Sequence, residues 1–366
     1  MKRTTIEKMG KRVLSFCLIT IFLIFTITGC NDDETRSENS QDSTENVQDE
    51  KSEEETRLSM ILPFAYSSVE DINLEKGSSI SIIGQKSSGA YWTALKNGAN
   101  KAVEDINKIL GYEGQDKVKV VYSSPSNSDI EQQINILDEE LARYPVALAI
   151  SPLDMKACEV QFDLASENNI PIVTFNSGSD YPGVNAYVGT DNINSSNEVA
   201  ERIQSDAEEN EKVLVVSASS KCKAESTRET AFLEAITKGE KPLEAVETFK
   251  IDDTETTLTK ILSADKDIKG IYATSAEATD AVTEELSKSM YKYRGITFIG
   301  YDITEASKKA LTDKVADAVI EQNPYGMGYA TVIAAARAAL DMGNEAVVDT
   351  GYKLITADKL DDETLY

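Results

Sequence analysis

The chain has 366 residues, 63 acidic against 37 basic side chains, and no histidine. This length is too great for one compact core and suggests about two domains, and the formal charge of −26 argues against a nucleic-acid partner, because phosphate binding needs a positive field. The absence of histidine excludes Ser-His-Asp and Cys-His nucleophile systems and histidine-containing zinc and haem sites, which leaves an enzyme only carboxylate or lysine chemistry.

The first thirty residues have the pattern of a secretory signal. Five basic residues precede Val13, and the stretch 13–27 is almost entirely apolar. A basic head and an apolar stretch of about 7–15 residues are typical of a signal, whereas a bilayer span needs about 20. The end of this stretch, ITGC, resembles the lipobox of bacterial lipoproteins, which implies a signal peptide over 1–29 and lipidation of Cys30. An uncleaved membrane anchor is the alternative, and in both cases the rest of the chain is extracytoplasmic.

The next segment, residues 31–57, contains eleven acidic residues and a single apolar one, Val47. Such a segment cannot bury enough apolar surface to offset its ordering entropy. We therefore expect a disordered acidic tether over 30–57 that holds the protein at the membrane through the lipid on Cys30; an acidic tail that binds calcium or a partner is the alternative. Residues 58–78 are assigned to an N-terminal arm, whose run LSMILPFAY can pack on the following domain.

From Ser79 onward, short apolar runs alternate with amphipathic stretches such as 91–110 and 128–144. The runs are continuous rather than alternating, which is typical of strands that are buried on both faces of a parallel sheet. They are Ile80–Ile83, Val118–Tyr122, Val146–Ile150, Ile172–Phe175, Val213–Ser217, Val246–Phe249, Gly270–Ala273, Ile296–Ile299 and Ala316–Ile320.

This pattern predicts an α/β fold with two doubly wound parallel-sheet lobes, which divide near the polar connection 187–194. Ligands of open parallel sheets bind outside the carboxyl ends of the strands, so the polar residues after each run are the candidate site. None of these loops is a glycine-rich phosphate loop, and Gly326-Met327-Gly328 is too short for a dinucleotide fingerprint. We expect no cofactor and no metal. Cys158 and Cys222 fall in different predicted lobes, so we expect no disulfide between them.

From about Ser79 to its end, the chain resembles the type I periplasmic binding proteins of the ribose/galactose class, which share a fold with the ligand domains of LacI-type repressors. The segments that carry the resemblance are SIIGQKSSGAYWTALKNGANKAVED, VALAISPLDMKA, NNIPIVTFNS, YVGTDN, AESTRETAF, IYATSAEATDAV, FIGYDITEASKKA and VIEQNPYGMGYA. The repressors' helix-turn-helix headpiece is missing. The resemblance implies three crossings between the lobes, with the first lobe at 79–190 plus 323–350 and the second at 191–322 plus 351–366.

The same resemblance implies a ligand site in the cleft. Tyr91 and Trp92 match two aromatics that cover the apolar face of a sugar ring, and core packing at the helix start is the alternative role. Arg228 matches a cleft arginine, whose five fixed donors suit vicinal hydroxyls or a carboxylate, and in isolation it would be read as a solvated residue on a helix. Asp302 matches an aspartate that orients the ligand, and its alternative role is to cap the following helix.

Further cleft positions are implied at Gln322, which matches a residue of the return crossing, and at Ser275, which stands where the family often carries Asn or Asp. Asn176 and Ser177 stand where many pentose and hexose binders have an Asp-Arg pair. Both charges are absent here, so the ligand can be a different polyol, a larger saccharide or a non-sugar.

We therefore expect a monomeric, lipid-anchored binding protein rather than an enzyme, which captures a saccharide for an ABC permease. Three alternatives stay open. The protein can present its ligand to a membrane sensor such as a histidine kinase or chemoreceptor. It can be a carboxylate-based glycosidase, which needs two acids about 5–9.5 Å apart, although Asp302 has no acidic partner at a matched position. It can also be an adhesive surface lipoprotein with an empty cleft.

Overall fold

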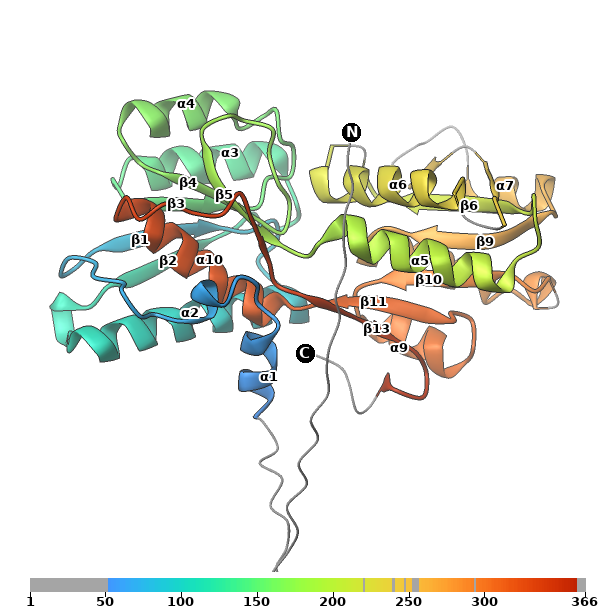
Figure 1. Ribbon diagram of the computed structural model, residues 1–366. Coiled ribbons are helices and arrows are strands. Elements are labelled where there is room, and N and C mark those ends of the chain that lie inside the picture. Colours follow the sequence, from blue (N-terminus) through green and yellow to red (C-terminus); the bar gives the residue numbers. More distant parts are fainter. Residues whose placement is uncertain are drawn as a thin grey trace, which may run out of the picture. The chain divides into compact units, whose positions relative to one another are not determined.

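Two β-sheets, each with helices on both faces, make up the described part of the chain (Figure 1). This computed structural model describes residues 52–360 except 220, 239–240, 247, 252–256 and 293. The predicted signal, Cys30 and the predicted tether up to residue 51 therefore lie outside the described residues. The two sheets confirm the predicted α/β fold with two parallel-sheet lobes.

The first sheet has the strand order β12-β5-β4-β3-β1-β2, and every neighbouring pair is parallel. Its strands are β1 (Ser79–Ile83), β2 (Lys119–Ser123), β3 (Ala147–Ile150), β4 (Ile172–Phe175), β5 (Val184–Gly189) and β12 (Val347–Asp349). The helices on one face are α2 (Ala90–Leu110) and α10 (Pro324–Ala339), and those on the other are α3 (Ile130–Leu141) and α4 (Glu159–Glu167).

The second sheet has the order β13-β11-β10-β9-β6-β7, with β8 also paired to β6. The pairs are parallel except β11 with β13, which is antiparallel. Its strands are β6 (Lys212–Ser217), β7 (Glu244–Ala245), β8 (Phe249–Lys250), β9 (Ile268–Ala273), β10 (Thr297–Tyr301), β11 (Ala318–Gln322) and β13 (Tyr352–Ile355). One face packs on α5 (Asn192–Asp206) and α6 (Lys223–Ile236), and the other on α7 (Leu258–Ala264), α8 (Ala276–Leu286) and α9 (Glu305–Thr312).

Two glycines let α2 and α10 pack closely in the first lobe. A Cβ atom on Gly98 would lie 1.9 Å from the carbonyl oxygen of Tyr325, and one on Gly328 would lie 1.9 Å from that of Leu95. Only glycine fits both positions, because a carbonyl group of a facing helix cannot move aside as a flexible side chain can. This contact fixes α10, which begins directly after one of the crossings between the lobes.

The chain passes between the sheets at three places, which lie between β5 and α5, between β11 and α10, and between β12 and β13. Asp191 is the N-cap of α5 and accepts hydrogen bonds from the backbone N–H groups of Ile193 and Asn194. Asn323 caps α10 in the same way through Gly326. Each of these two helices therefore begins at a crossing, and its capping side chain fixes both the start of the helix and the end of the crossing.

Helix α1 (Glu53–Ser59) corrects the predicted extent of the tether. Residues 53–57 were assigned to a disordered segment, but Ser52 and Glu55 form a reciprocal capping box at the start of this helix. Lys101 pairs with Glu54 at 3.0 Å, so a partner from α2 also holds the acidic turn. The 3-10 helix η1 (Phe64–Ser67) follows, and its Tyr66 is buried in the core of the first lobe.

The predicted strands need correction at three places. Residues 184–189 form β5, so residues 187–189 belong to a strand rather than to the predicted polar connection 187–194, because the strand lies between β4 and β12 and buries only some of its side chains. The predicted strand 246–249 overlaps the observed strands at Phe249 alone, since β7 (Glu244–Ala245) ends before it and β8 (Phe249–Lys250) begins at its last residue. The short strands β12 and β13 were not predicted. Among the described residues, no helix is both long and apolar enough to cross a bilayer.

Candidate functional site

A cavity of about 460 Å³ lies between the two lobes, at the carboxyl ends of both sheets. Seven of the eight residues predicted to bind a ligand line this cavity: Tyr91, Trp92, Asn176, Arg228, Ser275, Asp302 and Gln322. The structure therefore brings together residues that are up to 231 positions apart in the sequence (91 to 322). Each of them follows a strand or ends one, as the geometry of parallel sheets requires.

Ser177, the eighth predicted residue, is not among the residues that line the cavity. Its side chain is buried, and its hydroxyl oxygen lies 3.6 Å from the sulfur of Cys222 on the second lobe. The structure thus gives Ser177 a contact between the lobes instead of a place on the cavity wall. Cys222 and Cys158 are both free thiols.

The two aromatics of the first lobe form one wall of the cavity. Tyr91 and Trp92 lie in the first turn of α2, and their rings meet edge to face with centroids 5.2 Å apart. The Tyr91 hydroxyl donates to Oδ1 of Asn176 at 2.9 Å. Asn176 has a φ of 58°, in the left-handed region that asparagine tolerates better than most residues, and its amide nitrogen donates to Ser151 Oγ. These contacts hold the wall in place without a charged group.

Arg228 is the most completely held polar residue of the second lobe. It comes from α6, is 3% exposed, and donates to Asn192 Oδ1 at 2.8 Å, to the carbonyl of Thr274 at 2.7 Å and to Gln322 Oε1 at 3.2 Å. Its guanidinium carbon also lies 3.6 Å from the centre of the Tyr301 ring, a cation–π contact. The arginine is thus fixed before any ligand enters, and it is not a solvated helix residue.

Asp302 follows β10 with a φ of 66°, and its Oδ1 accepts a hydrogen bond from Gln322 Nε2 at 2.8 Å. It does not cap the next helix, because Thr304 is the N-cap of α9. Burial raises the pKa of the Asp302 carboxyl from 3.8 to about 6, although Arg228 and the bond from Gln322 act in the opposite direction. A half-buried carboxyl group that loses its proton near pH 6 is mostly ionised at pH 7, and the carboxylate is then a strong hydrogen-bond acceptor for hydroxyl groups.

Gln322 connects the site to the hinge. Its Oε1 accepts from Thr190 Oγ1 at 3.0 Å as well as from Arg228, and Thr190 lies in the first crossing. Ser275 is the N-cap of α8 and accepts from the backbone N–H of Ala278, so its hydroxyl has a structural role besides its place on the wall. The hydrogen bond between Gln322 and Thr190 therefore links the site to the first crossing, whereas that of Ser275 stays within the second lobe.

Glu225 lines the same cavity and was not predicted. It is 6% exposed, and its Oε2 accepts from the backbone N–H of Ala218 at 2.7 Å, with the hydroxyls of Ser217 and Thr274 at 3.2 and 3.1 Å. Among the described residues, no donor is hydrogen-bonded to its Oε1. The sequence offered one sign that Glu225 belongs to the site: it lies three residues before Arg228, so the two residues share one helix face.

Contacts between charged side chains join the two lobes around the cavity. Lys86 pairs with Glu277, Lys223 Nζ lies 2.9 Å from Asp180 Oδ1, and Lys221 Nζ lies 3.8 Å from Asp154 Oδ2. In each pair one partner belongs to the first sheet's lobe and the other to the second. The structure therefore shows the lobes in contact across the mouth of the cavity, an arrangement called closed below.

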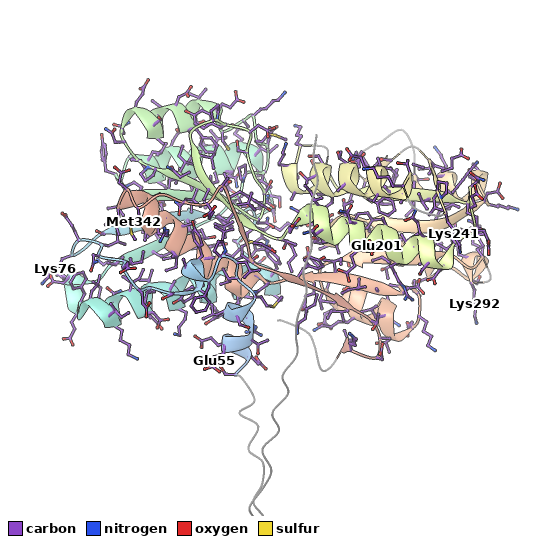
Figure 2. The ribbon with its side chains drawn as sticks, viewed as in Figure 1. Glu55, Lys76, Glu201, Lys241, Lys292 and Met342 are labelled. Atoms are coloured by element: carbon purple, nitrogen blue, oxygen red, sulfur yellow. The ribbon has the colours of Figure 1, made fainter. Side chains whose placement is uncertain are left out.

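A second cavity, of about 650 Å³, lies between α5 and α6, where Figure 2 labels Glu201. None of the predicted site residues lines it. Among residues 52–360, with the gaps given above, no group of three or more Cys, Asp or Glu side chains is placed to hold a metal ion. The cavity between the lobes therefore remains the candidate site, because, unlike the cavity between α5 and α6, it combines aromatic rings with polar groups from two lobes.

Comparisons with known proteins agree with this architecture. The chain is 24% identical over 268 residues to the ribose import binding protein RbsB of Haemophilus influenzae, which covers 73% of this chain and 87% of that protein. RbsB of Escherichia coli is 21% identical over 271 residues, with 74% and 87% covered.

Solved structures show the same fold. A carbohydrate transporter solute binding protein from Agrobacterium radiobacter, in complex with D-arabinose, has a TM-score of 0.67 at 26% identity and covers 78% of this chain and 96% of that one. The glucose-galactose binding protein GanP from Geobacillus stearothermophilus has a TM-score of 0.69 at 22% identity, with 78% and 99% covered. A model of the periplasmic binding protein domain matches residues 80–345, well over half of the chain. The chain belongs to the periplasmic binding protein domain family.

Proposed function

We propose that this protein is an extracytoplasmic sugar-binding protein that captures its ligand between the two lobes and passes it to an ABC permease. The observation that carries the proposal is the cavity between the lobes, which is lined by two aromatic rings on one side and by Arg228, Asp302 and Gln322 on the other. Its volume, about 460 Å³, lies in the range of small-molecule sites. The relatives named above are two ribose import binding proteins, a carbohydrate transporter solute binding protein that holds D-arabinose and a glucose-galactose binding protein.

In the proposed binding mode, the first lobe supplies the aromatic contacts to the sugar and the second lobe supplies the charged hydrogen-bonding groups. Trp92 and Tyr91 cover the apolar C–H face of the sugar ring, because an aromatic ring matches that face in size and excludes water from it. Asp302 accepts hydrogen bonds from two ring hydroxyls, and Arg228 donates to ring oxygens. Glu225 adds an acceptor, since no donor among the described residues is bonded to its Oε1 while three groups hold its other oxygen.

The lobes close on the sugar because groups that bind it come from both sides. A dissociation constant of order 1 μM corresponds to about −8 kcal/mol. Several hydrogen bonds to fixed charged groups and one stacked ring can supply this free energy after the ordering costs of closure. We propose further that Cys30 carries the lipid that keeps the protein at the cell membrane, and that the protein works as a monomer.

The test is isothermal titration calorimetry of the chain from residue 31 onward, which contains every residue that the structure describes. We expect one or a few pentoses or hexoses to bind with a dissociation constant of order 1 μM. Asp302→Asn should abolish this binding, whereas Asp313→Asn, on the exposed end of α9, should leave it unchanged. A panel in which no sugar binds, or a sugar that binds equally well to Asp302→Asn, would refute the proposal.

A further inference from the structure

Residues 52–63, which comprise α1 and the first part of the predicted N-terminal arm (58–78) and are called the arm from here on, precede the part of the chain that the family model matches and contact the crossings between the lobes. The carbonyl of Arg57 accepts a hydrogen bond from Nδ2 of Asn323 at 2.7 Å. Leu62 and Asp349 exchange two backbone hydrogen bonds, of 2.7 and 2.9 Å. Asn323 lies at the crossing between β11 and α10, and Asp349 ends β12 just before the crossing to β13. The arm is therefore bonded to two of the three crossings.

The arm is itself held by the first lobe. Glu54 pairs with Lys101 of α2, and the guanidinium of Arg57 lies over the ring of Tyr325 in α10, 5.5 Å from its centre. Just beyond the arm, the Tyr66 hydroxyl donates to Oδ1 of Asn344 at 3.2 Å. Helix α1 buries none of its own residues, and Glu55 lies on its exposed side (Figure 2). Ile61, just after α1, is buried in the core of the first lobe, and the polar contacts of α1 join that lobe to the hinge.

Asn323 and Asp349 extend these contacts to every crossing. Asn323 is fully buried, and the same amide nitrogen that contacts the arm also donates to the carbonyl of Thr350 at 2.9 Å. Oδ1 of Asp349 accepts from the backbone N–H groups of Gly351 at 2.9 Å and of Asp191 at 3.2 Å. Asp191 lies in the first crossing, and Thr350 and Gly351 form the third.

Gly351 brings the arm into direct contact with the third crossing. Its φ of 77° lies in the left-handed region, and a Cβ atom added to it would lie 2.9 Å from Cβ of Met60. The backbone of the crossing therefore packs against the arm at the point where the chain leaves the first lobe for the second. Rotation of the lobes changes backbone dihedrals at such connections, so these contacts depend on the angle between the lobes.

We propose that residues 52–63 act as a hinge clamp that stabilises the closed arrangement of the lobes and so sets the closed fraction of the ligand-free protein. The contacts described above are made in the closed arrangement, and contacts that exist in one state shift the equilibrium toward that state. A larger closed fraction changes the apparent affinity in proportion, because the ligand is held only between closed lobes. This last step rests on the proposed function, but the clamp itself does not.

The closed fraction can be measured through Cys222 without knowing the ligand. Ser177→Cys puts a second thiol opposite Cys222, where the present oxygen-to-sulfur distance is 3.6 Å, and Cys158→Ala removes the other thiol of the chain from residue 31 onward. Under a mild oxidant, the rate of disulfide formation between the two lobes is proportional to the fraction of time that they are closed. Deleting Ser52–Met60 should lower this rate about tenfold, which corresponds to about 1.4 kcal/mol.

A point variant tests the same contact from the hinge side. Asn323→Asp keeps the acceptor that caps α10 but removes the donor to Arg57 and Thr350, and it should slow disulfide formation to a similar extent. Asn344→Asp is the matched control, because it makes the same chemical change at a residue that contacts Tyr66 and Ala334 and touches no crossing. A nine-residue deletion within 36–44 of the predicted tether is the control for the shortened chain. Both controls should keep the rate of the parent.

Three results would overturn the proposal. The first is an unchanged rate of disulfide formation in the folded Ser52–Met60 deletion. The second is a slower rate in Asn344→Asp equal to that in Asn323→Asp, which would indicate general loosening of the first lobe. The third is loss of cooperative unfolding in the deletion, which would make the arm part of the core. If the proposed function is wrong instead, no sugar will change the rate of disulfide formation in the Ser177→Cys, Cys158→Ala protein that retains the arm.

Discussion

Replacing Asp302 by asparagine is expected to stabilise the ligand-free protein at neutral pH while it removes sugar binding. Burial raises the pKa of this carboxyl from 3.8 to about 6, so the folded state holds a proton between these pH values that the unfolded state has released. The free energy of unfolding therefore falls as the pH rises through this range. Asparagine avoids the cost of the buried charge, tolerates the φ of 66°, and can still accept the bond from Gln322.

The size of the effect follows from the two pKa values. Their difference, multiplied by about 1.4 kcal/mol per pH unit, gives about 3 kcal/mol by which the ionised carboxyl destabilises the folded state above pH 7. Well below pH 3.8 the carboxyl is protonated in both states, and the cost disappears. The stability of Asp302→Asn should then exceed that of the parent by about 3 kcal/mol at pH 7.5 and by less than about 1 kcal/mol at pH 4.

The assay is urea denaturation of both proteins at pH values from 4 to 8, without sugar. Asp313→Asn serves as the control, since Asp313 is exposed at the end of α9 and far from the cavity wall. A gap between Asp302→Asn and the parent that stays constant over this pH range would refute the reasoning, as would an Asp302→Asn protein that is the less stable of the two at pH 7.5.

Three further changes test the site and the packing that positions it. Trp92 is the only tryptophan, so sugar binding should change the intrinsic fluorescence, and Trp92→Phe should weaken binding about tenfold in calorimetry while leaving the thermal midpoint unchanged. Glu225→Gln keeps an oxygen for Ala218 but turns the free acceptor into a donor, so binding of neutral sugars should fall about tenfold, and equal affinity would exclude Glu225 from the site. Gly98→Ala should lower the free energy of unfolding by about 3 kcal/mol or more, because the added carbon would meet the Tyr325 carbonyl, whereas Gly178→Ala, with 3.5 Å of space, should change it little.

Much of the fold could be predicted because buried parallel strands are continuous apolar runs, as in 80–83 and 172–175. Strand β5 was missed since Val184–Gly189 mixes polar and apolar residues, and its place in the sheet is decided by its neighbours rather than by its own pattern. Helix α1 was missed for a related reason. Its acidic sequence looks disordered alone, and it is held by a capping box and by Lys101, a residue some fifty positions away.

The residues of the candidate site were predicted more completely than the hydrogen bonds that hold them in place. Seven of the eight residues that the family resemblance implied line the cavity, and most of them lie just after the carboxyl end of a strand. Ser177 lies one residue beyond Asn176, and a change of one position is enough to turn a side chain toward the other lobe. Glu225 resembles any exposed acid on a helix until Ser217, Ala218 and Thr274 are seen around it.

Binding to a protein whose lobes have been locked together tests most directly whether the ligand enters between them. In the Ser177→Cys protein, oxidation of the new thiol with Cys222 in the absence of sugar should close the mouth of an empty cavity. We predict that the oxidised protein takes up no sugar in calorimetry and that reduction restores binding to the level of the parent. Equal binding by the oxidised and the reduced protein would contradict the account, because the ligand would then be held somewhere other than between the lobes.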